Sequence, residues 1–357
     1  MESKGWAQYY TNEWCRSWQE SFARISAFWR REAMAKPIVR YGSPIRELPA
    51  PTHRTDWESY HADPQTVFQR IAAQLANTEY CGEALPCISA YQGHTAASFL
   101  GSPHRYDSRT IWTEPCLERI SDEFDVAKWR TDTRWIDLKR MLSYYLQQAH
   151  GRCGVGYGIG CVVQAIALMR GTANFLTDLV DSPEAVESFR DRLLAEWLVR
   201  AEELEAMLPE GAGRWIPFSI WAPGRSIFSE CDVSALFSER MFRRFVVPEV
   251  QAMARWAEFS FYHLDGPGAD KHLDALLEIP ELDCIQWIRG AGGGRAADWL
   301  PLLKRIQHGG KRLYVECPVS EPRTLLRHLS PDGLMLDVEG CVGRREAEEV
   351  TAILSGQ

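Results

Sequence analysis

Short apolar runs recur along the chain from about residue 80 onward, separated by stretches with helical spacing. This alternation constrains the fold most, because a strand, a helix and a second strand form a right-handed crossover unit with parallel strands. The runs interpreted as strands are Cys87–Tyr91, Val155–Ile159, Trp215–Trp221, Phe259–His263, Cys284–Ile288, Arg312–Glu316 and Leu334–Val338. An eighth strand is expected at Pro37–Tyr41 or at Thr110–Trp112.

Helical patterns fill the intervals between these runs. They cover Pro183–Leu208, Glu239–Glu258, Ala269–Leu277, Ala297–Ile306 and Arg344–Leu354. Seven or eight such repeats favour a closed (β/α)8 TIM barrel over an open doubly wound sheet. We therefore expect an α/β protein in which residues 81–357 form the barrel as a single catalytic domain. Residues 1–80 are expected to be a helical N-terminal extension packed on it.

Large apolar side chains recur at three- and four-residue intervals near the start of the chain. They are Trp14, Trp18, Phe22, Ile25 and Trp29. This spacing predicts an amphipathic helix. Its apolar face would pack either on the barrel or on a second subunit, as in a homodimer.

Composition narrows the class of protein. Of the 357 residues, 45% are apolar and 25% are charged, which is typical of a folded soluble protein. The net charge of −8 argues against nucleic-acid binding, which needs a basic face. No apolar run approaches the roughly 20 residues of a membrane helix, and the first residues do not resemble a signal peptide. The ten cysteines include no CxxC pair, and we expect reduced thiols and a cytoplasmic location. We also expect a small-molecule substrate.

A barrel carries its catalytic residues at the carboxyl ends of its strands. The polar, sulfur-containing and aromatic residues at or just after those ends are Tyr157, Trp221, Glu230, Cys231, Asp232, His263, Asp265, Gln286, Glu316, Cys317, Glu339 and Cys341. Imidazole, thiolate and carboxylate groups are zinc ligands, so a catalytic metal is one interpretation. In the other, His263 bonds to a loop, Asp265 caps a helix, and the cysteines are small core residues.

From these positions we assign roles as hypotheses. Catalytic roles are expected for His263, Asp265, Glu230 and Glu316. Substrate contacts are expected from Tyr157, Trp221, Asp232, Gln286 and Trp287. Asp232 or Ser234 is also well placed to cap the following helix. Trp112, Trp221, Phe228 and Trp287 suggest that an aromatic or apolar small molecule could be enclosed, although such residues also serve ordinary packing.

Four segments of the chain resemble the uroporphyrinogen decarboxylase superfamily. They are AIALMRGTANFLTDLVDSPEAVESF, DVSALFSERMFRRFVVPEV, FYHLDGPGADKHLDALLEIPELDCIQW and MLDVEGCVGRREAEEVTAIL. The similarity runs from about residue 155 to the last residues, and earlier only AFWRREAMAKPIV matches loosely. The resemblance implies a (β/α)8 barrel.

Two activities occur in that superfamily. True decarboxylases carry an N-terminal motif of the type MRQAGR, for which WRREAMAK at 29–36 is a poor substitute. The zinc-dependent methyltransferases, including those that use a corrinoid, carry a His-x-Cys pair and a distant cysteine. Here His263-Leu264-Asp265 stands in place of His-x-Cys, and Cys341 stands at the distant position. This sequence is therefore closer in its motifs to the methyltransferase branch.

The resemblance implies a zinc-dependent methyltransferase. His263, Asp265 and Cys341 would bind the metal, with Glu230 or Glu316 completing its ligands. A methyl group would move between a small substrate or thiol and a corrinoid or similar carrier presented by a partner protein. Two alternatives stay open. One is a metal-independent decarboxylase or lyase of a small carboxylated substrate, with His263 and Asp265 as acid and base. The other is a non-catalytic subunit that docks a corrinoid protein.

Overall fold

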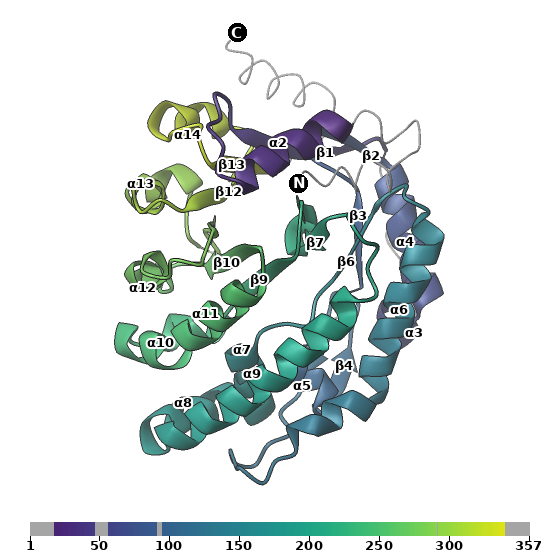
Figure 1. Cartoon of the computed structure of the whole chain (residues 1–357), viewed down its shortest axis with the longest axis vertical. Coiled ribbons are helices and arrows are strands. Elements are labelled where there is room, and N and C mark those ends of the chain that lie inside the picture. Colours follow the sequence, from purple (N-terminus) through teal and green to yellow (C-terminus); the bar gives the residue numbers. More distant parts are fainter. Residues whose placement is uncertain (1–17, 47–55, 91–94, 291, 340–357) are drawn as a thin grey trace.

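The computed structural model describes residues 18–46, 56–90, 95–290 and 292–339. Helices surround a central, mostly parallel sheet (Figure 1). The helices are α2 (Gln19–Trp29), α3 (Trp57–Ala62), α4 (Pro64–Ala76), α5 (Ala96–Phe99), α6 (Thr133–Ala149), α7 (Val162–Arg170), α8 (Thr172–Asp181), α9 (Pro183–Glu205), α10 (Glu239–Phe245), α11 (Val247–Trp256), α12 (Leu273–Leu277), α13 (Leu300–His308) and α14 (Pro322–His328).

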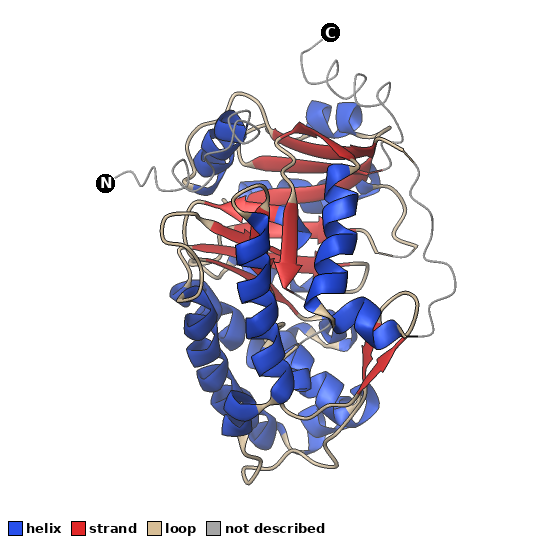
Figure 2. Cartoon of the chain, turned by 90° about the vertical axis from the view of Figure 1, so that its right-hand side faces the viewer, coloured by secondary structure: helices blue, strands red, loops and turns tan. Residues whose placement is uncertain are grey.

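The strands alternate with these helices along much of the chain. They are β1 (Ile38–Pro44), β2 (Thr78–Gly82), β3 (Cys87–Ala90), β4 (His104–Tyr106), β5 (Ile111–Thr113), β6 (Gly154–Tyr157), β7 (Arg214–Ile216), β8 (Ile220–Ala222), β9 (Ser226–Glu230), β10 (Phe259–Asp265), β11 (Cys284–Ile288), β12 (Arg312–Pro318) and β13 (Leu334–Glu339). Figure 2 shows most of the strands in the upper half of the molecule, while the lower half is mostly helical apart from one short strand pair.

The main sheet has the order β2-β1-β13-β12-β11-β10-β9. All its neighbours are parallel except β2, which runs antiparallel to β1. A second parallel pair is β3 with β6, and two antiparallel pairs are β4 with β5 and β7 with β8. Among the described residues the hydrogen-bonded sheet is open, so the closed TIM barrel expected from the sequence is not shown.

The region around β7 accounts for one gap in the sheet, the gap between β6 and β9. The run Trp215–Trp221, predicted as one strand, folds back on itself because Phe218 and Ser219 adopt positive φ angles of 63° and 53°. The resulting β7 contacts both β6 and β9. A Cβ built on Gly154 of β6 would lie 2.0 Å from the indole of Trp215, so that ring packs directly against the β6 backbone. The hairpin therefore occupies the place where β6 and β9 would otherwise pair.

Alternation of side chains along the strands divides the core in two. Tyr262 and Leu264 of β10 belong to the large core cluster beneath the outer helices. Phe261, on the other face of the same strand, belongs to a second cluster that includes Phe22 and Trp29 of α2. His263 and Asp265 follow Phe261 at two-residue intervals, so they lie on this second face, away from the outer helices.

The N-terminal residues contribute to both the sheet and its cover. The ring of Phe22 in α2 lies 4.5 Å from that of Trp221, and the indole of Trp29 donates to the Trp221 carbonyl at 2.9 Å. β1 lies between β13 and β2 in the main sheet. The division between residues 1–80 and 81–357 stays a prediction. Trp14 and the expected helix Arg344–Leu354 lie outside the described residues.

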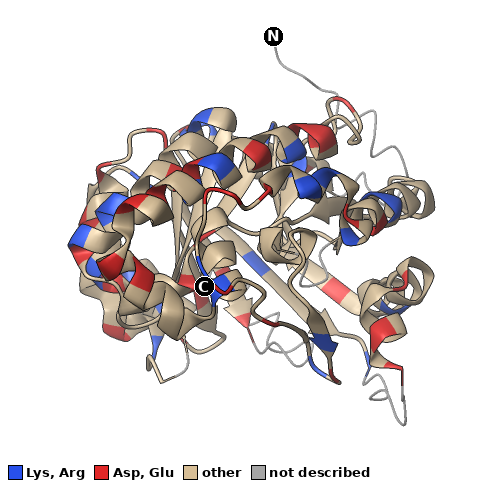
Figure 3. Cartoon of the chain, turned by 90° about the horizontal axis from the view of Figure 1, so that it is seen from below, with Lys and Arg blue, Asp and Glu red and all other residues tan. Residues whose placement is uncertain are grey.

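Acidic and basic residues are intermixed along the outer helices (Figure 3). Many of them form ion pairs, such as that of Arg244 with Glu184 and Glu187. Within the described ranges, none of the helices combines the length and the hydropathy needed to cross a lipid bilayer.

Candidate functional site

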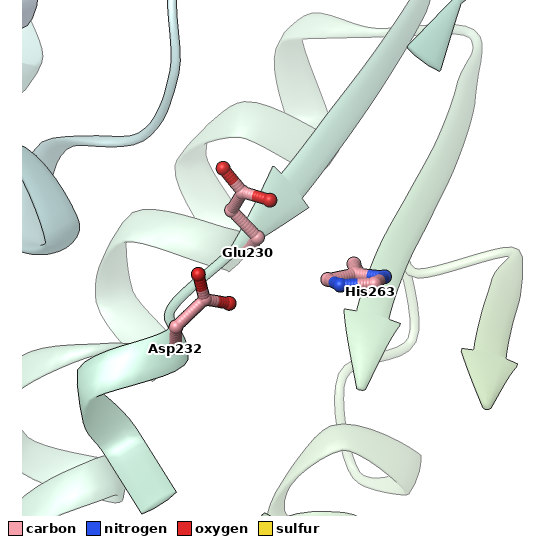
Figure 4. A group of neighbouring side chains, drawn as sticks. All are labelled: Glu230, Asp232 and His263. Carbon is pink, nitrogen blue, oxygen red and sulfur yellow. The ribbon is translucent and has the colours of Figure 1, made fainter. Parts of the chain in front are cut away.

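Three ionisable side chains converge at the carboxyl ends of β9 and β10. Glu230 ends β9 and pairs in register with His263 of the parallel strand β10, and Asp232 begins the 3-10 turn Asp232–Leu236. Each offers one ligand atom, and these atoms all lie within 4.8 Å of one another. Figure 4 shows the imidazole extending from β10 toward the two carboxylates. We call these residues the carboxylate–histidine triad.

A hydrogen bond orients His263. Its Nδ1 lies 2.6 Å from Oε1 of Gln286, the residue paired with it on β11. Because an amide oxygen accepts, Nδ1 is assigned the proton and Nε2 keeps its lone pair. Nε2 has no hydrogen-bond partner in the described part of the chain. The imidazole is thus held in the tautomer that can bind a metal or accept a proton through Nε2.

Two aromatic rings cover the imidazole. The Phe218 ring stacks on it at 5.4 Å between centroids with an interplanar angle of 28°, and the Phe228 ring lies at 5.7 Å. Phe218 itself is 39% exposed. The rings limit the approach of water to one side of His263 and leave the side facing the carboxylates.

The carboxylates of the triad are crowded by like charge. Burial raises the pKa of Glu230 to about 8, and the neighbouring charges of Asp232 and Asp265 add to this shift. Burial also raises the pKa of Asp232, against the lowering effect of His263. The side-chain oxygens of Glu230 and Asp232 accept no hydrogen bond from any residue that the structure describes. A bound cation would relieve this repulsion.

A buried arginine holds the turn that carries Phe218. Arg40 of β1 donates from Nη2 to the carbonyl oxygens of Phe218 and Ser219 at 2.7 and 3.1 Å. Its Nη1 lies 3.6 Å from Asp337 of β13, which also accepts a hydrogen bond from the Tyr314 hydroxyl. Two successive non-glycine residues with positive φ are strained by about 1–3 kcal/mol each. These contacts stabilise the strained turn and so keep Phe218 over His263.

A cavity of about 190 Å³ adjoins the triad. Glu230 forms part of its wall, and Phe218 and Phe228 separate it from the imidazole. Tyr157 lies on the wall too, and its hydroxyl donates to Glu205 at 3.1 Å. The cavity thus connects a predicted substrate-binding residue, Tyr157, with the carboxylate of Glu230.

Other predicted site residues lie close to the triad without belonging to it. Asp265 follows His263 on the same face of β10, and its charge raises the pKa of both triad carboxylates. Gln286, expected to contact substrate, instead bonds to His263. The side chain of Cys341, expected to bind metal, lies outside the described residues.

The remaining predicted residues are placed elsewhere. Glu316 lies beside Glu339, and burial together with that neighbour raises its pKa to about 8. Trp221 is fully buried against α2 and donates to the Ala212 carbonyl at 3.0 Å. Trp287 is on the opposite face of β11 from Gln286 and packs at 4.6 Å against Trp299. The structure does not bring these two tryptophans to the triad.

The triad fits a divalent metal by its donor set. One imidazole nitrogen and two carboxylate oxygens are ligands that zinc and other divalent transition metals accept. Neither carboxylate of the triad has an arginine or a lysine among the described residues whose charge lowers its pKa. The set lacks a thiolate among the described residues, and it is therefore harder than the ligand set that the sequence resemblance implied.

Phe218 was not predicted as a site residue. Phe218 lies within an apolar run, where nothing in the sequence distinguishes it from a core residue. Only the fold-back at Phe218 and Ser219 brings its ring onto His263. The pairing of Gln286 with His263 depends on the register between β10 and β11, which the sequence does not contain.

No family model matches the chain, and no curated protein is significantly similar to it in sequence. Its structure is similar to that of a methyltransferase from Methanosarcina mazei, with a TM-score of 0.60. The match covers 94% of this chain and 98% of that chain, at 13% sequence identity. The two proteins therefore share a fold over nearly their whole lengths.

Proposed function

We propose that this chain is a metal-dependent methyltransferase whose metal, zinc by the sequence resemblance, is held by His263, Glu230 and Asp232. The observation that carries the proposal is the convergence of these three side chains beside a cavity. The fold shared with a methyltransferase supports it. We also propose that the parallel strands follow a (β/α)8 plan, interrupted where the β7–β8 hairpin lies between β6 and β9.

The residues of the chain have distinct parts in this proposal. His263, Glu230 and Asp232 would hold the divalent ion, whose Lewis acidity would lower the pKa of an acceptor thiol. Gln286 fixes the His263 tautomer, and Glu230 and Asp232 offer negative charge to the ion. Phe218 and Phe228 exclude water from one side of the imidazole. A corrinoid presented by a partner protein is the proposed methyl carrier.

Methyl transfer from a methylated corrinoid to a thiol tests the proposal. The absorbance of the methylated corrinoid should fall as a thioether forms in equal amount. His263→Ala should lower the rate by at least roughly 100-fold, because loss of a ligand costs more than loss of its hydrogen-bond partner. His308→Ala, at an exposed position on α13, serves as the matched control. Full activity in His263→Ala, or after complete removal of metal by a chelator, would contradict the proposal.

A metal-independent lyase or decarboxylase is the second candidate. It is favoured by the mutual proximity of the Glu230 carboxyl group and Nε2 of His263, which has no hydrogen-bond partner among the described residues, because both groups can exchange protons with a substrate. In that case chelation would leave activity unchanged, while His263→Ala and Glu230→Gln would both abolish it.

A further inference from the structure

The cavity beside Glu230 is lined mainly by flat and branched apolar side chains. Trp197 comes from α9, Trp215 and Ile216 from β7, Phe218 from the turn after β7, and Phe228 from β9. At about 190 Å³ the cavity is somewhat larger than an apolar cavity of about 150 Å³ that accommodates benzene in another protein. Its size thus suits one aromatic ring with a small substituent.

Most polar groups on the wall are already paired within the protein. The indole of Trp197 donates to the Gly160 carbonyl at 2.8 Å. Arg214 donates from Nε to Glu205 at 2.5 Å, and Tyr157 donates to the same carboxylate. Among the described lining residues Arg214 is the one cation, and its charge is neutralised by Glu205. The part of the wall that the structure describes offers no free positive charge to an anionic ligand.

Besides the Glu230 carboxyl group, one further polar side chain on the wall has no hydrogen-bond partner among the described residues. Ser226 begins β9 on the same face as Phe228 and Glu230, and it is only 6% exposed. Its hydroxyl has no hydrogen-bond partner among the described residues. A buried hydroxyl without a partner is unfavourable, because it has lost its hydrogen bonds to water. An oxygen atom on a ligand in the cavity would supply that partner.

We infer that this cavity binds an uncharged monocyclic aromatic molecule carrying one oxygen substituent, with the ring between Trp215 and Phe228 and the oxygen at Ser226. The inference rests on the proposed function only in making this ligand the small substrate of methyl transfer. The binding itself requires neither the metal nor a corrinoid. Such a ligand would lie against the wall that Glu230 shares with the triad.

Isothermal titration of the full chain with phenol, toluene and benzoate tests the inference. Phenol should bind most tightly, toluene more weakly, and benzoate not at all, because a carboxylate entering this cavity finds no free cation. Ser226→Ala should weaken phenol binding by roughly two- to tenfold and leave toluene binding unchanged, which is the effect of removing one hydrogen bond. Tighter binding of benzoate than of phenol would overturn the inference.

A cavity-filling variant provides a second test. Ile216→Phe should weaken both phenol and toluene by more than tenfold, because the added ring occupies the ligand volume. Val199→Phe is the matched control, since Val199 is 50% exposed on α9, the helix that carries Trp197. If Ile216→Phe does not fold, as judged by circular dichroism, the phenol–toluene comparison in Ser226→Ala decides. Equal affinities of the wild type and a folded Ile216→Phe would also overturn the inference.

These measurements separate the two proposals. Because titration needs no methyl donor, phenol binding without any methyl transfer would uphold the cavity ligand and reject the proposed function. Methyl transfer by a chain that binds neither phenol nor toluene would uphold the proposed function and reject this ligand.

Discussion

The orientation of one imidazole decides what the triad can do. A histidine whose Nδ1 donates to an acceptor presents Nε2 in a fixed direction, and here the acceptor is the amide oxygen of Gln286. Gln286 is fully buried, and its Nε2 has no partner among the described residues, so the bond to His263 is its principal polar contact. We therefore assign Gln286 the positioning of His263 rather than contact with substrate.

Removing this hydrogen bond should weaken metal binding without unfolding the protein. Gln286→Leu is expected to lower the affinity for zinc by roughly 10- to 100-fold, the usual effect of losing the hydrogen-bond partner of a ligating histidine. Gln286→Glu should retain tight binding, because a carboxylate also accepts from Nδ1. Competition with a chromophoric chelator measures both affinities. An unchanged affinity in Gln286→Leu would show that Gln286 does not position the ligand.

The sequence indicates which residues lie at strand ends, but not which side of the strand each of them faces. Glu230, Asp232 and His263 were selected because ionisable side chains follow apolar runs. Gln286 and Trp287 were both selected, yet adjacent residues of a strand face opposite sides, so only one of them can face the triad. Their sides could not be predicted because both faces of a buried parallel strand are apolar over most of its length.

Among the elements, the strands with continuous apolar runs were predicted best. The bounds Cys284–Ile288 match β11, and β10, β12 and β13 differ only by extensions at their ends. β9 was missed because only Ile227 and Phe228 of its five residues are apolar. Without a predicted strand there, the sequence could not indicate the register that places Glu230 opposite His263. The convergence of the triad therefore could not be derived from spacing along the chain.

A buried carboxyl group connects two helices near β9. Glu249 of α11 is 2% exposed and accepts hydrogen bonds from the backbone amides of Val162 and Val163 at 2.6 and 2.8 Å, at the start of α7. Burial raises its pKa from 4.5 to about 7, although these bonds and Arg190 oppose the shift. The folded protein therefore retains this proton at pH values where the unfolded chain has lost it.

This shift makes stability depend on pH with a definite sign. Because the folded state binds more protons than the unfolded state between pH 4.5 and about 7, the contribution of Glu249 is full below pH 4.5 and declines as pH rises toward 7. The loss amounts to about 3 kcal/mol. Glu249→Gln should lack this decline, so the difference between wild type and variant should change with pH. Urea unfolding at several pH values measures it, and parallel pH profiles would contradict the assignment.

Within the protein as a whole, the triad lies where two parts of the core meet. The outer helices bury one face of the main sheet, while α2 and the β7–β8 hairpin pack against the other. The β7–β8 hairpin is not part of the main sheet, and its turn, which Arg40 holds, places Phe218 over His263. The site therefore depends on segments from β1, the hairpin, β9, β10 and β11.

The overall α/β class was predictable from the alternation of apolar runs and helical patterns, and the fold shared with a methyltransferase agrees with that class. The open sheet was not predictable. One of its openings involves the contact of Trp215 with glycines of β6, two segments far apart in the sequence. The spacing of apolar runs along the chain predicts roughly how many strands there are, but it does not predict which strands pair.

Metal analysis of the purified chain is the decisive test of whether the triad binds a metal ion. After incubation with zinc and removal of unbound ions, we expect about one equivalent of metal per chain, because three protein ligands and one open position make a catalytic site. His263→Ala and Glu230→Gln should lose this metal, and His308→Ala should retain it. A folded wild-type protein that binds no divalent metal, or a His263→Ala variant that binds as much as the wild type, would contradict the account.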